Sequence, residues 1–365
     1  MSTETPQTLL LDSPLEIRNF RCFQHLQIEK LGRVNLIVGE NGVGKTALLE
    51  ALHLYANPTD ADLIKLILKS RDDYLGFSAF FHGRVFDANV LPDSIEIGLR
   101  DKPESKLSFY LHPVRHTNEV EEESSEEETE ANSRSSREIG IKIGYESKEF
   151  RTKISVPQEY ESLIKLLLNE NRDKERIRAV FVSAKGLVMD EMERFWNKSI
   201  LSNKKKEIII ALNIVPAGER IEDLTFIRFE NSRGRFPVVQ IAGLENAVSL
   251  RSLGEGMVRM LGLALALANA KDGMLLVDEI ESGLHYSIQA AMWNMIFKTA
   301  AKLNVQVFAT THSWDCVEGF QQAAQENEDI EGMLIRLKRR GDAIVPTLFD
   351  ERRLAIATRE QIEVR

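Results

Sequence analysis

The octapeptide Gly39-Glu40-Asn41-Gly42-Val43-Gly44-Lys45-Thr46 fits the pattern Gly-x-x-x-x-Gly-Lys-Ser/Thr, which forms the phosphate-binding loop of nucleoside triphosphatases. The apolar residues 34–38 before it are typical of a buried strand, and residues 47–52 after it are typical of a helix. Glycines in such a loop let successive backbone N–H groups turn toward the phosphates. We expect Lys45 to reach the β- and γ-phosphates of ATP and the Thr46 hydroxyl to bind Mg²⁺. The residues predicted to hold the nucleotide are Gly39, Asn41, Gly42, Val43, Gly44, Lys45 and Thr46.

A second run, Met274-Leu275-Leu276-Val277-Asp278-Glu279, places two carboxylates directly after four apolar residues. A buried strand would deliver both acids to the carboxyl edge of a sheet, where ligands of open α/β sheets bind. We predict that Asp278 holds Mg²⁺, directly or through water, and that Glu279 is the general base that orients the attacking water. Alone, this pair would be read as an ordinary polar turn. Beside a phosphate loop it indicates hydrolysis of ATP.

A third apolar run, residues 303–310, ends in Thr311-His312. A histidine at the end of a strand near the γ-phosphate can donate a hydrogen bond that depends on that phosphate, so we count His312 among the catalytic residues. Apolar residues recur between the two strands at the spacing of one helix face, which predicts a crossover helix and parallel strands. These residues are Ile288, Ala291, Met292, Met295, Ile296 and Leu303.

The segment Ser249-Leu250-Arg251-Ser252-Leu253-Gly254-Glu255-Gly256 precedes an apolar helix predicted from Met257 to about Ala270. Ser252 and the two glycines would stand at the amino end of this helix, where backbone N–H groups attract anions. A plain helix cap explains the segment as well. Its position about twenty residues before the Asp-Glu strand favours the anion site.

Composition and cysteine usage fit a soluble protein of enzyme size, in which 43% of the 365 residues are hydrophobic. The first residues show no signal-peptide pattern, and the longest apolar stretch, 261–268, is too short to span a bilayer. The only cysteines, Cys22 and Cys316, lie far apart, which suits a reducing compartment. We therefore predict a cytoplasmic protein without a membrane partner.

The net charge of −9 comes almost entirely from one segment. Eight of the 56 acidic residues are glutamates between Glu119 and Glu130, which leaves 48 against 47 basic residues in the rest of the chain. The surrounding residues 116–138 are of low complexity, so we predict a disordered acidic loop. It would be either a docking tail for a partner or, as we favour, a solvated insertion.

The order of the four motifs resembles that of ABC-type ATPase heads, and within that class the RecF, SMC and OLD group, whose members are often described as AAA-type ATP-binding proteins. The resemblance rests on residues 15–23, on the phosphate loop, on Asp278-Glu279-Ile280-Glu281-Ser282-Gly283-Leu284-His285 and on Thr311-His312-Ser313. It covers residues 13–57 and about 236–349 well. It implies a P-loop NTPase fold, an α/β head with a mixed sheet and inserted antiparallel and helical lobes.

The resemblance also implies a mechanism. Two subunits of such heads enclose two ATP molecules, each bound by the loop of one subunit and the signature of the other. The signature residues here would be Ser252, Gly254, Glu255 and Gly256, acting in trans. We expect a homodimer or a higher assembly of dimers. Arg21 or Phe23 is a further candidate for contact with the adenine or the phosphates, and packing of Phe20 and Phe23 in the core explains the segment equally well.

Two departures from the family pattern limit the function. The glutamine that usually faces magnesium is missing, since none occurs between Gln27 and Gln158; the region of Phe80-Phe81-His82 would have to replace it, or the role goes unfilled. OLD-type relatives carry a Toprim nuclease domain after the head, whereas 53 residues follow His312 here. We therefore expect any nuclease to be a separate chain.

The domain prediction follows the resemblance: a discontinuous head formed by 1–57 and 236–349, inserted lobes at 58–235 and a C-terminal tail at 350–365. In the insert we predict helices near 158–170 and 188–214 and strands near 94–100, 106–111, 139–144, 148–154, 177–182 and 224–230. Three short basic clusters are candidate nucleic-acid contacts, but solvated faces explain them better. They are Lys204–Lys206, Arg233–Arg235 and Arg336–Arg340.

Three functions remain open. The favoured one is an ATPase that dimerises on ATP and controls a separate effector, a nuclease or toxin, as in phage defence. The alternative is a RecF-like clamp that binds DNA during repair. A scaffold without turnover is disfavoured because Lys45, Asp278 and Glu279 are all present.

Overall fold

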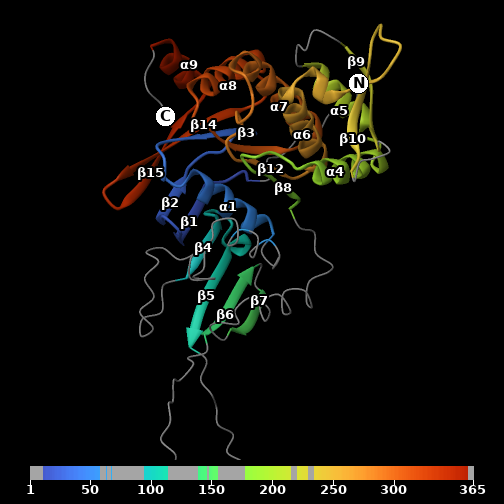
Figure 1. Cartoon of the computed structure of the whole chain (residues 1–365). Helices are drawn as coiled ribbons and strands as arrows, with labels where there is room; N and C mark the ends of the chain where they lie inside the picture. The colour runs from blue at the N-terminus through green and yellow to red at the C-terminus, as the bar shows by residue number, and fades with distance from the viewer. Residues whose placement is uncertain are drawn as a thin grey trace, which may run out of the picture.

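A central, mostly parallel sheet organises the molecule (Figure 1). The computed structural model describes residues 11–57, 63, 67, 94–113, 139–145, 148–154, 177–214, 220–228 and 234–360. The sheet has the order β15-β14-β3-β13-β12-β8, and only the pairing of β14 with β15 is antiparallel. Its strands are β3 (Val34–Val38), β8 (Ala179–Val182), β12 (Met274–Val277), β13 (Gln306–Thr310), β14 (Gly332–Arg340) and β15 (Ala343–Phe349). The predicted α/β fold and the parallel pairing of β12 with β13 are confirmed.

Alternation along the strands divides the core into two halves, one on each face of the sheet. Leu275 and Val277 belong to one buried cluster, while Met274 and Leu276 belong to the other. Because successive side chains of a strand point to opposite faces, the continuous apolar run of β12 serves both halves.

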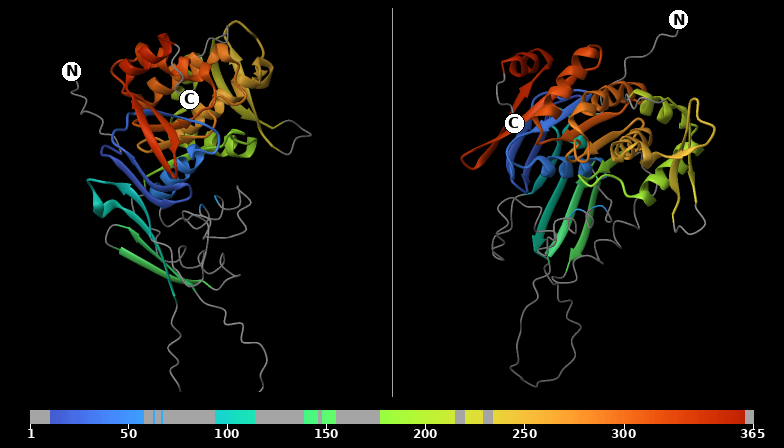
Figure 2. Two further views of the ribbon diagram at one scale, coloured as in Figure 1. Left: turned by 90° about the vertical axis from the view of Figure 1, so that its left-hand side faces the viewer. Right: turned by 45° about the horizontal axis from the view of Figure 1, so that its top comes forward.

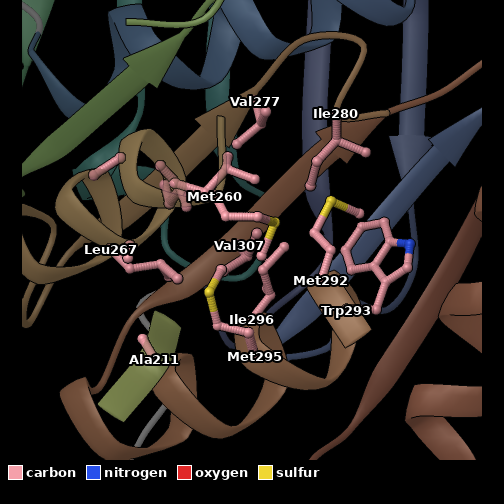
Figure 3. Close-up of a cluster of buried hydrophobic side chains, with 14 of the residues drawn as sticks. Ala211, Met260, Leu267, Val277, Ile280, Met292, Trp293, Met295, Ile296 and Val307 are labelled. Carbon is pink, nitrogen blue, oxygen red and sulfur yellow. The ribbon is translucent and has the colours of Figure 1, made fainter. Parts of the chain in front are cut away.

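Helices cover the face of the central sheet on which Leu275 and Val277 lie, called the first face below. They are α4 (Met189–Leu201), α5 (Lys205–Ile214), α6 (Glu255–Asn269), α7 (Gln289–Leu303) and α8 (Trp314–Glu326). Figure 3 shows Met260 of α6 and Met292, Trp293, Met295 and Ile296 of α7 in one cluster with Val277 and Val307 of the sheet. The predicted crossover helix is therefore α7, and its methionines and tryptophan are core residues.

The second face is covered by α1 (Lys45–Ala56) and by part of an antiparallel sheet with the order β2-β1-β4-β5-β6-β7. This sheet consists of β1 (Leu15–Phe20), β2 (Phe23–Ile28), β4 (Ile95–Leu99), β5 (Leu107–Pro113), β6 (Ile139–Tyr145) and β7 (Lys148–Ile154), with the short 3-10 helix η2 (Pro103–Ser105) between β4 and β5. Its outer strands extend away from the head in all views (Figures 1 and 2). β1 and β2 belong to the segment predicted as part of the head. They thus share one sheet with β4 to β7, which belong to the predicted insert.

Two predicted elements of the insert differ from the structure. Residues 188–214 form two helices, α4 and α5, because Asn203 takes a left-handed conformation (φ 54°) between them. The strand predicted at 177–182 is β8, which pairs with β12 in the central sheet and so belongs to the head. The other predicted strands correspond to β4, β5, β6, β7 and β9. The helix predicted at 158–170 and the acidic loop at 116–138 lie outside the described residues.

The remaining elements complete the head. A small sheet is formed by β9 (Ile221–Ile227), β10 (Phe236–Ile241) and β11 (Val248–Ser249), and the 3-10 helices η3 (Leu250–Leu253) and η4 (Tyr286–Ile288) precede α6 and α7. The segment predicted as a tail begins with α9 (Glu351–Arg359), which buries Leu354 and Ala357 in the first core half. No helix in the described ranges has the length and apolar character to cross a membrane.

Candidate nucleotide-binding and hydrolysis site

The phosphate loop joins β3 to α1 in a conformation that requires glycine. Gly39 and Gly44 have φ angles of 144° and 107°, which L side chains rarely adopt. A Cβ at Gly39 would collide with the carbonyl oxygen of Leu337, and one at Gly44 would lie 2.5 Å from Cys22 Sγ. Asn41 and Gly42 are exposed at the tip of the loop, while Val43 anchors it in the core. The loop is therefore fixed at both ends and open at its tip.

Lys45 lies across the inner side of this loop. Its Nζ donates to the carbonyl oxygens of Gly39 (2.6 Å) and Glu40 (3.0 Å) and lies 3.4 Å from His312 Nδ1. Burial lowers the pKa of Lys45 from its usual value, and the nearby carboxylates act in the opposite direction. The ammonium group is thus held at the phosphate loop beside His312, the histidine predicted to contact the γ-phosphate.

Asp278 is the centre of a hydroxyl–carboxylate cluster at the carboxyl ends of β12 and β13. Thr46 Oγ1 lies 3.2 Å and 3.1 Å from the two oxygens of its carboxylate, and Thr310 Oγ1 donates to Asp278 Oδ1 at 2.6 Å. The Asp278 N–H donates to the Val182 carbonyl of β8 at 2.9 Å. Asp278 and Thr46, predicted as the Mg²⁺ ligands, are therefore brought together by segments 232 residues apart.

Glu279 follows with a left-handed backbone (φ 44°), which is uncommon for a residue other than glycine. Its N–H donates to Thr310 Oγ1 at 2.8 Å, and its carbonyl accepts from Arg259 Nη2 at 3.4 Å. The peptide groups on either side of Glu279 are thus held by two different elements, β13 and α6.

His312 lies at the exposed end of β13, and its backbone N–H donates to Glu281 Oε1 at 2.9 Å. Together with the contact to Lys45, this bond fixes the histidine between the phosphate loop and the segment after β12. The residues predicted to act on the γ-phosphate, Lys45, Glu279 and His312, therefore share one edge of the sheet.

Arg21, a candidate for nucleotide contact, lies in a buried ion pair. Its Nε lies 2.6 Å from Glu50 Oε2, in an ion pair with side chains only 2% and 6% exposed. Glu50 belongs to α1, so the pair ties the turn between β1 and β2 to the helix after the phosphate loop. The guanidinium group is directed into the core here, which favours the packing alternative over nucleotide contact.

The predicted signature lies at the exposed amino end of α6. Ser252, Gly254 and Glu255 are exposed, and Gly256 is partly buried. The helix begins at Glu255, two residues earlier than predicted, so Glu255 and Gly256 form its first turn. Ser252 Oγ donates to the Ser249 carbonyl at 2.6 Å. These residues are available to a second molecule.

Two of the basic clusters make structural contacts. Lys204 Nζ donates to the Ala268 carbonyl (2.7 Å) near the end of α6, and Lys205 pairs with Asp223 at 2.6 Å. Arg235 lies 3.5 Å from Glu193. The third cluster, on β14, ends in Lys338, Arg339 and Arg340, which are exposed and have no ion pair within the described ranges. Residues 80–82, suggested in place of the missing glutamine, lie outside the described residues.

The sequence interpretation assigned no role to three side chains of the site. Thr310 joins Asp278 to Glu279, Glu281 holds the His312 backbone, and Arg259 reaches the Glu279 carbonyl. The run Thr310-Thr311-His312 at the end of an apolar strand was a sequence signal that could have identified Thr310. Arg259 gave none, because a single arginine near the start of an otherwise apolar helix has no distinctive pattern.

The chain matches a family model described as "AAA domain, putative AbiEii toxin, Type IV TA system" over residues 34–315. It is 22% identical over 364 residues to the ATP/GTP phosphatase of Helicobacter pylori, covering 92% of this chain and 94% of that protein. It is 48% identical over 40 residues, 11% of either chain, to the DNA replication and repair protein RecF of Thioalkalivibrio sulfidiphilus. The solved SMC head domain from Thermotoga maritima aligns with a TM-score of 0.46 and 12% identity, covering 92% of this chain and 98% of that one.

Proposed function

The chain belongs to this family of AAA domains and is an ATPase with an ABC-type head, and we propose that ATP binding joins two copies of it to control a separate effector protein. The observation that carries the ATPase mechanism is the approach of Thr46 Oγ1 to the Asp278 carboxylate, beside Lys45 of the phosphate loop. The cytoplasm, where ATP is available and both cysteines stay free thiols, is the proposed location.

The oxygen donors at this edge fit a magnesium ion. A hydroxyl and a carboxylate meet there, and Mg²⁺ prefers oxygen ligands, which it shares with the phosphates of a nucleotide. Thr46 and Asp278 would hold the ion, which neutralises charge on the phosphates when bound. Lys45 would turn from the Gly39 and Glu40 carbonyls toward the β- and γ-phosphates, a short movement for a flexible side chain.

Hydrolysis would depend on Glu279 and His312. The Glu279 carboxylate would accept a proton from the attacking water and orient it in line with the γ-phosphate. His312, whose ring contacts Lys45, would donate a hydrogen bond to the γ-phosphate and so respond to its loss. Both roles require the side chains to stand at the carboxyl edge of the sheet, next to the loop.

The dimer is supported by the position of the signature. Ser252, Gly254 and Glu255 are exposed at the amino end of a 15-residue helix, where N–H groups and the helix dipole favour an anion. We propose that they and Gly256 contact the γ-phosphate of ATP held by a second copy. Binding of ATP would then favour the dimer, and hydrolysis would release it.

The proposed effector is a separate protein, a nuclease or toxin of the phage-defence type. The description of the matching family, with its reference to a toxin–antitoxin system, supports a chain that works with a partner. The protein encoded by a neighbouring reading frame is the candidate to test. Its nuclease or toxic activity should change when this chain and ATP are added together, and should not change with the Lys45→Ala variant.

A second candidate, DNA binding in repair, is favoured by one observation. Lys338, Arg339 and Arg340 are exposed at the end of the β14–β15 hairpin, which projects from the head (Figure 1), and the described part of the chain offers them no ion pair. The short match to RecF is consistent with this candidate. Salt-sensitive binding of labelled duplex DNA, lost when the three cations become glutamine, would support it.

Two substitutions test the ATPase and the dimer. Glu279→Gln should abolish phosphate release but retain fluorescent ATP binding and an ATP-dependent dimer in sedimentation velocity, because only the base is lost. Lys45→Ala should lose ATP binding and the dimer together. Glu245→Gln, an exposed glutamate far from the loop in sequence, is the matched control. Turnover by Glu279→Gln at the wild-type rate would refute the role of Glu279, and a monomeric Glu279→Gln with ATP bound would refute the dimer.

A further inference from the structure

Arg259 connects the helix that begins with the signature to the backbone of the general base. It lies four residues after Glu255 on α6, on the same side of the helix. Its Nη2 donates to the Glu279 carbonyl and its Nη1 to the Ser183 carbonyl, both at 3.4 Å. Its Nε is buried and has no hydrogen-bond partner among the described residues. The guanidinium group is therefore committed to two backbone carbonyls rather than to a carboxylate.

The local backbone is shaped to receive this guanidinium group. Gly186 has a φ of 80°, and a Cβ there would lie 2.5 Å from Arg259 Nη1. Gly186 and Arg259 also line one pocket of about 510 Å³, together with Ser282 and Gly283. A residue other than glycine at 186 would displace the guanidinium group, so the turn after β8 fits the arginine by lacking a side chain.

The carbonyl that Arg259 holds belongs to an unusual residue. Glu279 has a left-handed backbone, and its N–H is already fixed by Thr310. Rotation of the peptide group between Glu279 and Ile280 would change the orientation of the Glu279 side chain. The hydrogen bond from Arg259 to the Glu279 carbonyl opposes that rotation. At 3.4 Å the contact is longer than an ordinary N–H···O hydrogen bond, so a shift of α6 toward Glu279 would strengthen it.

The core adds a second link between the same two elements. Met260, the next residue of α6, lies in one buried cluster with Val277 and Ile280, which flank Asp278 and Glu279 (Figure 3). Interiors are packed densely and transmit displacements rather than absorb them. A movement at the amino end of α6 therefore reaches the Glu279 backbone through both Met260 and Arg259.

We propose that Arg259 is a positioning residue that sets the orientation of Glu279 according to the position of α6. This inference rests on the proposed function, in which the amino end of α6 contacts ATP on a second copy. Engagement of that ATP would draw α6 into place, tighten the contact between Arg259 and the Glu279 carbonyl, and make the base competent. Hydrolysis would thus wait for the dimer, with Arg259 acting through the backbone of Glu279.

Two substitutions disturb the contact from opposite sides. Arg259→Met removes the donors, and Gly186→Ala displaces them while the charge remains. Gly243→Ala is the matched control for the second, because Gly243 has nearly the same φ, 84°, but no atom within 4 Å of an added Cβ. Arg194→Met, on the surface of α4, is the control for loss of an arginine.

The measurements are kcat and KM for ATP, fluorescent ATP affinity and the ATP-dependent dimer. Arg259→Met should lower kcat roughly 10- to 100-fold, with KM, ATP affinity and the dimer within about threefold of wild type, and Arg259→Lys should recover part of the rate. Gly186→Ala should lower kcat in the same way, and Gly243→Ala should not.

The outcomes separate this inference from the ATPase assignment. If wild type and Arg259→Met turn over ATP at rates within twofold, Arg259 does not position the base, although the ATPase assignment stands. If Arg259→Met loses ATP affinity or the dimer in proportion to kcat, its role is structural and the inference is wrong. If wild type itself shows no turnover while Glu279→Gln binds ATP equally well, the proposed function fails first.

Discussion

Thr310→Val is the substitution that tests the arrangement of the site most directly, because the hydroxyl of this fully buried residue serves two partners. It donates to Asp278 Oδ1 at 2.6 Å and accepts from the Glu279 N–H at 2.8 Å. Valine has nearly the same shape and the same preference for a strand, so the change removes the hydroxyl and little else.

The magnitude follows from the two bonds. A hydrogen bond to a charged carboxylate contributes about 1.5–3 kcal/mol, and a buried N–H left without a partner costs about 1–3 kcal/mol. The added methyl group of valine returns about 1 kcal/mol of hydrophobic stabilisation. We therefore expect the free energy of unfolding to fall by about 2–4 kcal/mol.

Urea unfolding followed by tryptophan fluorescence measures this loss, since Trp293 is buried on α7. With an m-value of about 3 kcal/mol per molar urea, a loss of about 3 kcal/mol lowers the midpoint by about 1 M. Thr310→Ser keeps the hydroxyl and should lose only about 1 kcal/mol, for the missing methyl group. The reasoning is wrong if the Val variant unfolds within about 0.2 M of wild type, or if the Ser variant falls as far as the Val variant.

Two further predictions concern charge and thiol chemistry. Burial acts to raise the pKa of Glu16, but hydrogen bonds from Arg18, His25 and Lys106 outweigh it and lower the pKa from 4.5 to about 2; the stabilisation by Glu16 is therefore complete above pH 4.5 and is lost as the pH falls toward 2. In urea unfolding, Glu16→Gln should lower the free energy of unfolding by about 3 kcal/mol at pH 7 and by almost nothing near pH 2. A loss of stability that does not depend on pH would contradict its origin in the Glu16 carboxylate. Burial raises the pKa of the Cys316 thiol to about 12, so iodoacetamide at pH 8 should modify partly exposed Cys22 and spare Cys316 until the protein unfolds. Peptide mass spectrometry reads both sites, and equal rates of modification in the folded protein would refute the difference.

Local patterns explain what the sequence could predict. The phosphate loop, the Asp-Glu pair and the crossover helix are each specified within about twenty residues, by glycine positions, by apolar runs and by helical spacing. The fold class followed from their order. Each of these signals depends on near neighbours in the chain, and so each could be read without knowing the partner elements.

The features that the sequence did not predict depend on distant partners. The Ala179–Val182 run predicts a strand, but nothing in it says that β12, nearly a hundred residues later, is its neighbour. The division of residues 188–214 into two helices depends on the left-handed Asn203, a conformation with only a weak sequence signal. The two alternatives for the segment around Arg21 stayed open because the sequence does not show that Glu50 of α1 lies opposite Arg21.

The same dependence on register explains why the site is assembled by strand ends. Ile37 of β3 is in register with Thr310 of β13, and Ala309 of β13 with Val277 of β12. The residues that leave these strands therefore emerge side by side: the phosphate loop after β3, Asp278 and Glu279 after β12, and His312 after β13. A slip of one residue in β13 would turn Thr310 away from Asp278 and exchange the side chains of its two faces between the core halves. Because both faces of β13 are packed, such a slip would cost much of the core, and the packing that stabilises the fold also fixes the spacing of the proposed catalytic groups.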